Sequence, residues 1–480
     1  MKNIYVKHTA IHISDYELGD SEILEKKLSV WDNLYYRYVP VAYSYDENTK
    51  ELRIPRGIDI NYVEKMFNTL ANIDYTPDAY DNMSIKVKTL PRDDIQKKSI
   101  AFLIGEGDFS YTTGYSQLLL NLPTGAGKTY VTATSLQFIG MKSIIITPTD
   151  KIKSQWYDTF INMTDVVNQY ICDISGSDVI KKILKSKSLK YKIYLVNHGT
   201  ITSYAKSHGW EAVHKLFEHI RVGVKIYDEA HLNFANIIKI DLHTNTKKTI
   251  YLTATFERSD YKENYLFNTC FKRTIKYGYE ARSELRKHIM YLSVMYNSKP
   301  DLGVQAYMST RMGFNKNRYS DYQESCPEFY EALKYVIDFF KDKEGKIMIL
   351  STKTSQVDSI KKFIDDNYNG IRASTFHSKI ADDDKSNAFD ADIICTTPKS
   401  AGTGADIPGL RTVIMCESYS SNVQADQVSG RLREYSKTDN TFYVELVDIG
   451  FPKVYKMYRG RLPVFKKKCL KILNIDLTKK

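Results

Sequence analysis

The stretch from Leu122 to Thr129 constrains the fold of this chain more than any other. It reads Leu-Pro-Thr-Gly-Ala-Gly-Lys-Thr. An apolar run at residues 118–122 leads into it, and a helix-compatible segment at residues 130–139 follows. A second apolar run occupies residues 143–146. This order predicts a strand, a glycine-rich turn, a helix and a second strand.

A glycine-rich turn between a strand and a helix is suited to binding phosphate. Its small residues let backbone N–H groups converge on phosphate oxygens at the N-terminus of the helix. Lys128 is predicted to reach the terminal phosphates of ATP, and the Thr129 hydroxyl to ligate Mg²⁺. The strict motif starts with glycine, where this chain has Leu122. The predicted ATP-binding residues of the turn are Pro123, Thr124, Gly125, Ala126, Gly127, Lys128 and Thr129.

An acidic pair, Asp228-Glu229, follows another apolar run at residues 222–227. Hydrolysis of Mg·ATP needs one carboxylate for the Mg²⁺ shell and one for the attacking water. Asp228 is predicted to take the first role, and Glu229 is predicted to orient or deprotonate the water. The alternative is an acidic cap before a helix. The phosphate-binding turn in the same chain favours the catalytic interpretation.

Short apolar runs alternate with helical segments along most of the remaining chain. Each run ends in a polar or glycine-containing turn, as is typical of parallel sheets in α/β proteins. Functional turns gather at the carboxyl ends of such strands. The runs are residues 143–146, 193–196, 222–227, 249–252, 347–350, 372–376, 392–395, 412–416 and 441–446.

The sequence is therefore predicted to form two parallel-sheet domains in tandem, residues 89–288 and 289–480. A small α+β domain, residues 1–88, is predicted to precede them. Residues 297–325 are polar and are interpreted as a long loop or insertion. The basic tail is interpreted as helical.

The first 88 residues carry signals of a small separate fold. Weak alternation over residues 4–13 predicts strands, residues 46–50 a hairpin turn and residues 60–70 a short amphipathic helix. The cluster Tyr35-Tyr36-Arg37-Tyr38 has the chemistry to stack on nucleic-acid bases. A half-buried β surface is the alternative.

Composition limits the class of protein. The chain has 68 Lys and Arg against 57 Asp and Glu, and its net charge of +11 favours a polyanionic partner such as nucleic acid. Its six cysteines are scattered without a Cys-x-x-Cys pair, which indicates neither a zinc site nor a disulfide framework. No apolar stretch is long enough to span a bilayer. We expect a cytoplasmic protein without a membrane partner.

Two further segments suggest contacts with a nucleotide. The stretch from Gln427 to Arg433 places two arginines where a second domain can offer them to a γ-phosphate, since the guanidinium fork binds phosphate bidentately. Gln96 lies upstream of the first core strand, and its amide can pair with an adenine edge.

In this order, the segments resemble the motifs of the superfamily 2 helicases and translocases of DEAH type. The similarity spans residues 90–450. The matching segments, from motif I to motif VI, are 123–129, 147–149 with 155–156, 197–200, 228–231, 253–255, 350–352, 396–397 with 402–408, and 427–433.

The resemblance implies two RecA-like lobes with ATP and Mg²⁺ between them and nucleic acid across their tops. It adds Gly404, Asp406, Gln427 and Arg431 to the ATP-binding residues, and makes Arg431 the safer arginine finger. The family's second finger stands three residues after the first, where this chain has Glu434, so Arg433 fits only with a local backbone shift. Asp93 stands where the family has a basic residue before Gln96.

The same resemblance assigns roles to other motif residues. Coupling of hydrolysis to movement falls to His231, Thr253 and Thr255. Contacts with the DNA backbone fall to Thr147, Pro148, Gln155, Gly199, Thr200, Ser351, Thr352 and Thr397.

Within the superfamily, the chain is most similar to phage branch-migration helicases of the UvsW and T-odd type. The shared features are a compact length, a small β-rich N-terminal domain and the segment 52–57. This predicts a monomeric DNA motor that unwinds or branch-migrates forked and Holliday-type DNA in replication, recombination or repair. If a phage encodes the protein, it would act in the host cytoplasm. The alternatives are an RNA helicase, the motor subunit of a restriction complex and a non-catalytic nucleic-acid scaffold.

Overall fold

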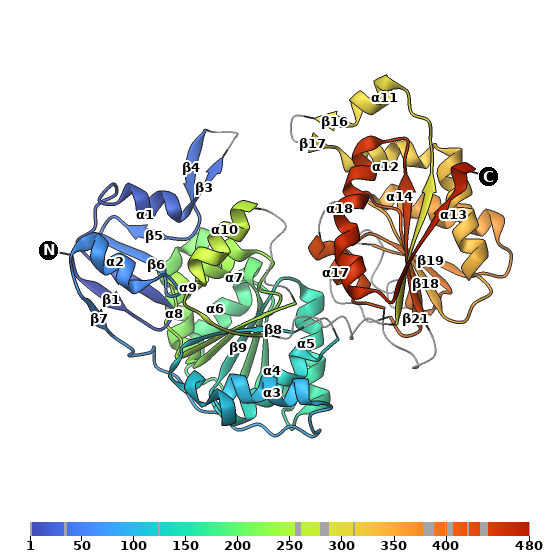
Figure 1. The fold of residues 1–480 in the computed structure, drawn as a ribbon. Coiled ribbons are helices and arrows are strands. Elements are labelled where there is room, and N and C mark those ends of the chain that lie inside the picture. Colours follow the sequence, from blue (N-terminus) through green and yellow to red (C-terminus); the bar gives the residue numbers. More distant parts are fainter. Residues whose placement is uncertain are drawn as a thin grey trace. The chain divides into compact units, whose positions relative to one another are not determined.

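The chain divides into two compact units, residues 1–280 and 281–480, in the computed structural model (Figure 1). The structure describes residues 2–32, 36–122, 125–254, 261–278, 288–310, 313–377, 388–398, 400, 407–419, 422–432 and 440–479. The fold class is the predicted one: two parallel α/β sheets in tandem follow a small mixed sheet. None of the helices in these ranges has the length and apolar character to cross a membrane.

The first unit begins with a five-stranded sheet in the order β5-β6-β2-β1-β7. Its strands are β1 (Ile4–Val6), β2 (Ala10–Ile13), β5 (Ser44–Asp46), β6 (Glu51–Pro55) and β7 (Ala71–Ile73). Helices α1 (Glu22–Lys27) and α2 (Ile60–Phe67) accompany it, and α2 ends at Asn68 in the left-handed conformation. The predicted hairpin turn at residues 46–50 is confirmed, since β5 and β6 pair antiparallel. A separate hairpin joins β3 (Ser29–Asp32) to β4 (Arg37–Pro40).

A seven-stranded parallel sheet completes the first unit, in the order β10-β11-β9-β12-β13-β8-β14. Its strands are β8 (Gln117–Asn121), β9 (Ser143–Thr147), β10 (Ile171–Ile174), β11 (Ile193–Asn197), β12 (Val224–Tyr227), β13 (Lys248–Thr253) and β14 (Ile275–Gly278). Its helices are α3 (Asp94–Ile104), α4 (Lys128–Ile139), α5 (Asp150–Met163), α6 (Ser177–Lys185), α7 (His198–His208), α8 (Trp210–Ile220), α9 (Phe234–Leu242) and α10 (Tyr261–Cys270), with short 3-10 helices η1 (Gly107–Gly114) and η2 (Asn168–Tyr170).

Strand β9 shows why these runs are continuously apolar. Ile144 and Ile146 belong to the hydrophobic cluster on one face of the sheet, and Ile145 belongs to the cluster on the other. All three side chains are fully buried. A strand covered by helices on both faces needs apolar side chains at every position.

The small sheet is fixed to the parallel sheet within the first unit. Arg273 donates its backbone N–H to the carbonyl of Gly57 at 2.9 Å, and its guanidinium pairs with Asp59 at 2.6 Å. Arg53 also lies 3.1 Å from His243 Nδ1. The small sheet and the parallel sheet belong to one compact unit. The domain boundary predicted between them at residue 88 therefore stays a prediction.

Gly57 makes this close approach possible. A Cβ atom there would overlap the backbone carbonyl of Cys270 and lie 2.9 Å from the Thr274 hydroxyl. We expect Gly57→Ala to lower the free energy of unfolding by about 1–3 kcal/mol, as overpacking does elsewhere. Thermal unfolding measures this. Gly114→Ala is the matched control, since a Cβ atom there meets nothing, and equal stability of the two variants would contradict the prediction.

The second unit contains a seven-stranded parallel sheet in the order β19-β20-β18-β21-β22-β15-β23. Its strands are β15 (Ile289–Tyr296), β18 (Lys346–Leu350), β19 (Ala373–Phe376), β20 (Ile393–Thr396), β21 (Leu410–Met415), β22 (Thr441–Asp448) and β23 (Lys471–Asp476). Its helices are α11 (Leu302–Tyr307), α12 (Lys316–Glu324), α13 (Pro327–Phe340), α14 (Thr354–Asn367), α17 (Asn422–Ser429) and α18 (Pro452–Lys468), with 3-10 helices η4 (Ala388–Asp390) and η5 (Leu477–Lys479).

The structure corrects two predictions for the second unit. The long loop predicted at residues 297–325 is wrong, because the described residues there form α11, the small hairpin of β16 (Ser309–Thr310) and β17 (Gly313–Phe314), and α12. The tail is helical only as far as Lys468, and it then adds β23 to the edge of the sheet beside β15.

Candidate active site

The phosphate-binding turn lies between β8 and α4, as predicted. Gly125 and Gly127 adopt left-handed φ angles of 84° and 87°, which glycine reaches without a steric penalty. A Cβ atom on Gly127 would also lie 2.5 Å from Gln96 Nε2. Leu122 is fully buried and donates its N–H to the Thr253 carbonyl at 3.0 Å, so an apolar anchor takes the place of the motif's first glycine.

Gln96 lies directly against this turn and is 4% exposed. Its Nε2 donates to the Ala126 carbonyl at 3.2 Å, and its Oε1 accepts the N–H of Arg92 at 2.8 Å. Asp93 stands where the family has a basic residue. It caps α3 by accepting the N–H of Gln96 at 2.9 Å. The Gln96 amide thus ties the segment before α3 to the turn, a role that the sequence did not predict. Its contact with adenine stays a prediction.

Lys128 and Glu229 form an ion pair at the start of α4. The Lys128 Nζ lies 2.8 Å from Glu229 Oε1, and both side chains are largely shielded from solvent. His231 Nδ1 lies 3.2 Å from Glu229 Oε2 and 3.3 Å from the Thr253 hydroxyl. The structure therefore gathers the predicted phosphate lysine, the predicted water-orienting carboxylate and two of the predicted coupling residues.

The backbone at Glu229 is in an unusual conformation. Its φ angle is 47°, in the left-handed region that non-glycine residues seldom adopt. Such conformations cluster at functional sites, where the surrounding contacts hold them. Here the turn is held by the Ala230 N–H, which donates to the Leu252 carbonyl at 2.7 Å.

Asp228 is buried behind this pair. Its Oδ1 accepts the Glu229 N–H and its Oδ2 accepts the indole N–H of Trp156, both at 2.8 Å. Burial, helped by the adjacent Glu229 charge, raises the Asp228 pKa to about 6, while Lys128 and Trp156 oppose this rise. A carboxylate held by two donors near a phosphate-binding turn fits a divalent cation, which would supply charge neutralisation to the phosphates. Asp228 and Thr129 are the residues that would hold it.

Trp156 is a second site residue with a role that sequence reasoning missed. The sequence placed it in motif Ia, beside a predicted DNA contact, but nothing in the spacing indicated a bond to Asp228. Its side chain is fully buried in α5. Helix α5 follows the turn at residues 147–149, which is predicted to contact DNA. Trp156 therefore connects this helix to Asp228, the predicted Mg²⁺ ligand.

Trp156→Phe keeps most of the ring and removes the N–H donor. We expect the Mg²⁺ concentration for half-maximal binding of a fluorescent ATP analogue to rise about tenfold, because residues that orient metal ligands contribute at this level. ATP hydrolysis should need more Mg²⁺ to the same extent. Trp210→Phe is the control, since its indole stacks on His243 instead, and an unchanged Mg²⁺ requirement in Trp156→Phe would contradict the prediction.

The predicted DNA contacts of the first unit surround the carboxyl ends of β9 and β11. Thr147 is fully buried and donates its hydroxyl to Asn197 Oδ1 at 2.8 Å, so only its backbone can face a strand. Pro148 and Gln155 are half-buried, and Gly199 is exposed beside half-buried Thr200 at the start of α7.

The corresponding residues of the second unit follow β18 and β20. Ser351 is fully buried, Thr352 is half-buried, and the Thr397 hydroxyl lies 3.0 Å from the Ser400 hydroxyl. Arg431 is half-buried in the turn after α17. Pro123, Thr124, Thr255, Gly404, Asp406 and Arg433 lie outside the described residues, as does the side chain of Gln427 in α17.

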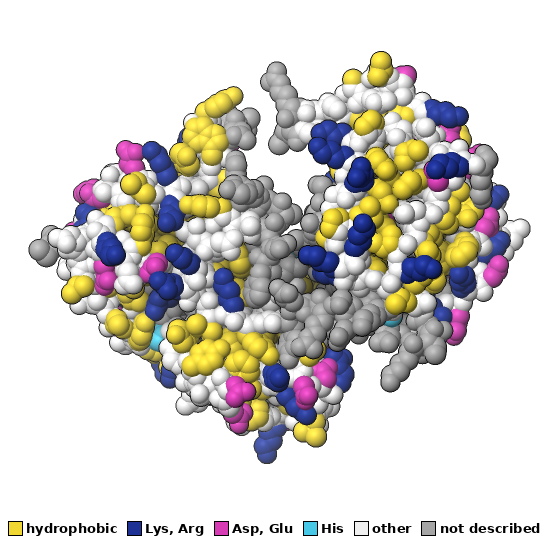
Figure 2. Space-filling model, in the orientation of Figure 1, with side chains coloured by type: hydrophobic (Ala, Val, Ile, Leu, Met, Phe, Trp, Pro, Cys, Tyr) yellow, Lys and Arg dark blue, Asp and Glu magenta, His cyan; other side chains and the backbone are white. Residues whose placement is uncertain are grey.

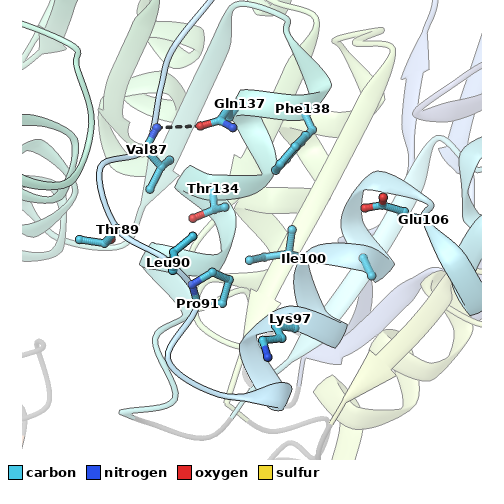
Figure 3. Close-up of a pocket in the computed structure, with 11 residues that line it drawn as sticks. Val87, Thr89, Leu90, Pro91, Lys97, Ile100, Glu106, Thr134, Gln137 and Phe138 are labelled. Carbon is cyan, nitrogen blue, oxygen red and sulfur yellow. Dashed lines mark hydrogen bonds between the residues drawn. The ribbon is translucent and has the colours of Figure 1, made fainter.

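A cavity of about 260 Å³ lies between α3, α4 and the segment of residues 87–91 (Figure 3). The Val87 N–H donates to Gln137 Oε1 at 2.7 Å beside it. Its lining shares no residue with the phosphate-binding turn. It is therefore distinct from the candidate nucleotide site.

Comparison with known families supports the interpretation of the motifs. Residues 75–258 match the family model of the type III restriction enzyme res subunit. Residues 329–434 match the helicase conserved C-terminal domain. The chain carries the domain pair of the superfamily 2 helicases.

The chain has poxvirus and mycobacterial relatives. Transcript termination protein A18 of fowlpox virus is 24% identical over 332 residues, covering 65% of this chain and 66% of that protein. DNA 3'-5' helicase XPB of Mycobacterium tuberculosis is 28% identical over 160 residues, covering 33% of this chain and 27% of that protein. The chain thus spans just under two thirds of the length of A18.

Solved structures share its fold. Yeast (S. cerevisiae) Dbp5 bound to RNA and ADP BeF3 superposes with a TM-score of 0.54 at 12% identity, covering 80% of this chain and 89% of that one. T4 UvsW is 15% identical and covers 99% of this chain and 100% of its own, with a TM-score of 0.38. That score is too low to support the predicted resemblance to phage branch-migration helicases.

Proposed function

We propose that this helicase is an ATP-dependent DNA motor that unwinds or branch-migrates forked and Holliday-type DNA. The observation that carries the proposal is the cluster of Lys128, Glu229 and Asp228 around the phosphate-binding turn. A structural scaffold has no need of a left-handed glutamate paired to a lysine beside a buried aspartate. The protein would act as a cytoplasmic monomer with ATP and Mg²⁺.

The residues suggest how one half of the cycle works. In the structure, Glu229 neutralises Lys128. When phosphates are bound, the Lys128 ammonium is drawn to them, and Glu229 is released to orient a water molecule. His231 contacts both the Glu229 carboxylate and the hydroxyl of Thr253, which belongs to β13. A movement of the carboxylate can therefore be passed through His231 to β13. Arg431 of the second unit is the proposed finger on the γ-phosphate.

We propose that the turns after β9, β11, β18 and β20 contact the DNA. These turns and the helices after them hold Pro148, Gln155, Gly199, Thr200 and Thr352 at or near the surface. Contacts from such turns reach the phosphate backbone and carry no base information. Binding should therefore weaken as salt rises and depend little on sequence.

The names of the relatives point to different substrates. Dbp5 was solved bound to RNA, XPB is named a DNA helicase, and A18 is named for transcript termination. An RNA helicase is therefore the main alternative. The match to the restriction-enzyme family model supports a second alternative, a motor subunit that works with a nuclease partner.

The rate of ATP hydrolysis with different nucleic acids tests the proposal. We expect forked DNA and four-way junctions to stimulate hydrolysis more than single-stranded or duplex RNA of equal length. Stronger stimulation by RNA would overturn the DNA assignment in favour of the RNA helicase. A stoichiometric nuclease that copurifies with the native protein would favour the restriction motor.

A further inference from the structure

The hairpin of β3 and β4 stands apart from both sheets of the first unit. Its strands pair only with each other, in antiparallel register, with Trp31 opposite Tyr38. Figure 1 shows it projecting from the body of the unit next to α1. In the same view, Figure 2 shows hydrophobic side chains on this projection.

Three aromatic side chains on the hairpin are open to solvent. Trp31 is 38% exposed, Tyr38 47% and Tyr36 79%. The Trp31 and Tyr38 rings meet edge to face at 5.1 Å. Trp31 is also more exposed than the other two tryptophans, since Trp156 is fully buried and Trp210 stacks on His243.

The base of the hairpin is fixed. The Ser29 hydroxyl donates to the Glu25 carbonyl at 2.6 Å, and the N–H groups of Val41 and Ala42 both donate to the Leu28 carbonyl. Val30, on the opposite face from Trp31, packs against the hydrophobic core. The exposed aromatic face is therefore held in place and is not a loosely packed part of the core.

The chemistry of this face suits unpaired bases better than the phosphate backbone. Residues 22–40 carry Lys26, Lys27 and Arg37 against Glu22, Glu25 and Asp32, so their charges cancel. A surface without net charge gains little from counterion release. Flat aromatic rings instead stack on bases of any sequence.

We propose that the β3–β4 hairpin stacks on unpaired bases of a single strand where a duplex opens. This inference rests on the proposed function, because it gives the motor an element that separates strands. The small sheet that carries the hairpin is fixed to the first lobe through Gly57, Asp59 and Arg273. A force on the hairpin is thus transmitted to the lobe that holds the phosphate-binding turn.

Tryptophan fluorescence tests the contact directly. Oligo(dT) should quench the emission of the wild-type protein, because a stacked base quenches indole. The quenching should be lost in Trp31→Phe and retained in Trp210→Phe, while anisotropy of labelled oligo(dT) reports binding in each variant. Quenching that persists in Trp31→Phe, or its absence in wild-type protein saturated with oligo(dT), would overturn the proposal.

Unwinding of a labelled fork tests the role. We expect the variant Trp31→Ala, Tyr36→Ala, Tyr38→Ala to unwind at least tenfold more slowly, with fork-stimulated ATP hydrolysis within twofold of wild type and unchanged thermal unfolding. Tyr111→Ala, which removes another exposed ring elsewhere on the unit, is the control and should unwind normally. Wild-type unwinding by the triple variant would overturn the hairpin's role. Absence of fork-stimulated hydrolysis in the wild type would instead refute the proposed function, and the fluorescence result would still decide the contact.

Discussion

Lys128→Ala is expected to reduce the rate of DNA-stimulated ATP hydrolysis by about 10²–10³-fold or more, the usual loss when one preorganised donor to developing charge is removed. The ammonium at the start of α4 is 2.8 Å from Glu229, and it is the cation in the phosphate-binding turn. Lys97→Ala, at an exposed position on α3, is the control. A Lys128→Ala variant with wild-type turnover would refute the assignment of the turn.

Glu229→Gln should be similarly inactive while still binding nucleotide. The amide keeps the size of the side chain but cannot orient or deprotonate water as a carboxylate does, and general bases contribute about 10²–10⁴-fold. Circular dichroism should show an unchanged fold in both variants. Loss of nucleotide binding in Lys128→Ala, together with retained binding in Glu229→Gln, would separate the two roles.

The second large effect concerns a buried ion pair in the first unit. Lys225 of β12 lies 2.6 Å from Asp241 of α9, and their side chains are 0% and 4% exposed. Asp241 also accepts the hydroxyls of Tyr227 at 2.8 Å and Tyr251 at 2.6 Å. Lys225→Ala leaves this carboxylate buried without its cation, so we expect the free energy of unfolding to fall by about 3–5 kcal/mol.

Denaturant unfolding of the variants measures this effect. Lys225→Met combined with Asp241→Asn should lose much less than Lys225→Ala, because the uncompensated charge is gone and an acceptor for a tyrosine hydroxyl remains. Lys26→Ala removes one partner of the exposed pair with Glu22 and should change stability by less than about 1 kcal/mol. A loss of that small size in Lys225→Ala would mean that the pair carries no buried charge.

The sequence predicted the parts of the fold that depend on local pattern. Central strands such as β9 are apolar at every position because both faces are covered. The turn at Gly125 and Gly127 needs glycine, so its composition identifies it. The pair Asp228-Glu229 was predicted as a site because it directly follows a buried strand.

Long-range contacts and polar elements at the edge of the fold could not be predicted from the sequence. Trp156 meets Asp228 across 72 positions of sequence, and no local pattern reveals such a bond. Strand β23 is an edge strand with only exposed and half-buried side chains, so it lacks a continuous apolar run. Helix α12 is polar, but Asn315 caps its N-terminus and Tyr319 is buried. The cap was the one available signal for this helix.

The most direct test of the account is strand displacement from a labelled DNA fork. The wild-type protein should release the strand with ATP and Mg²⁺, and should release none when ATP is omitted or replaced by a non-hydrolysable analogue. The Lys128→Ala and Glu229→Gln proteins should bind the fork and leave it intact. Release that is independent of ATP, or no release from any fork or four-way junction, would contradict the account.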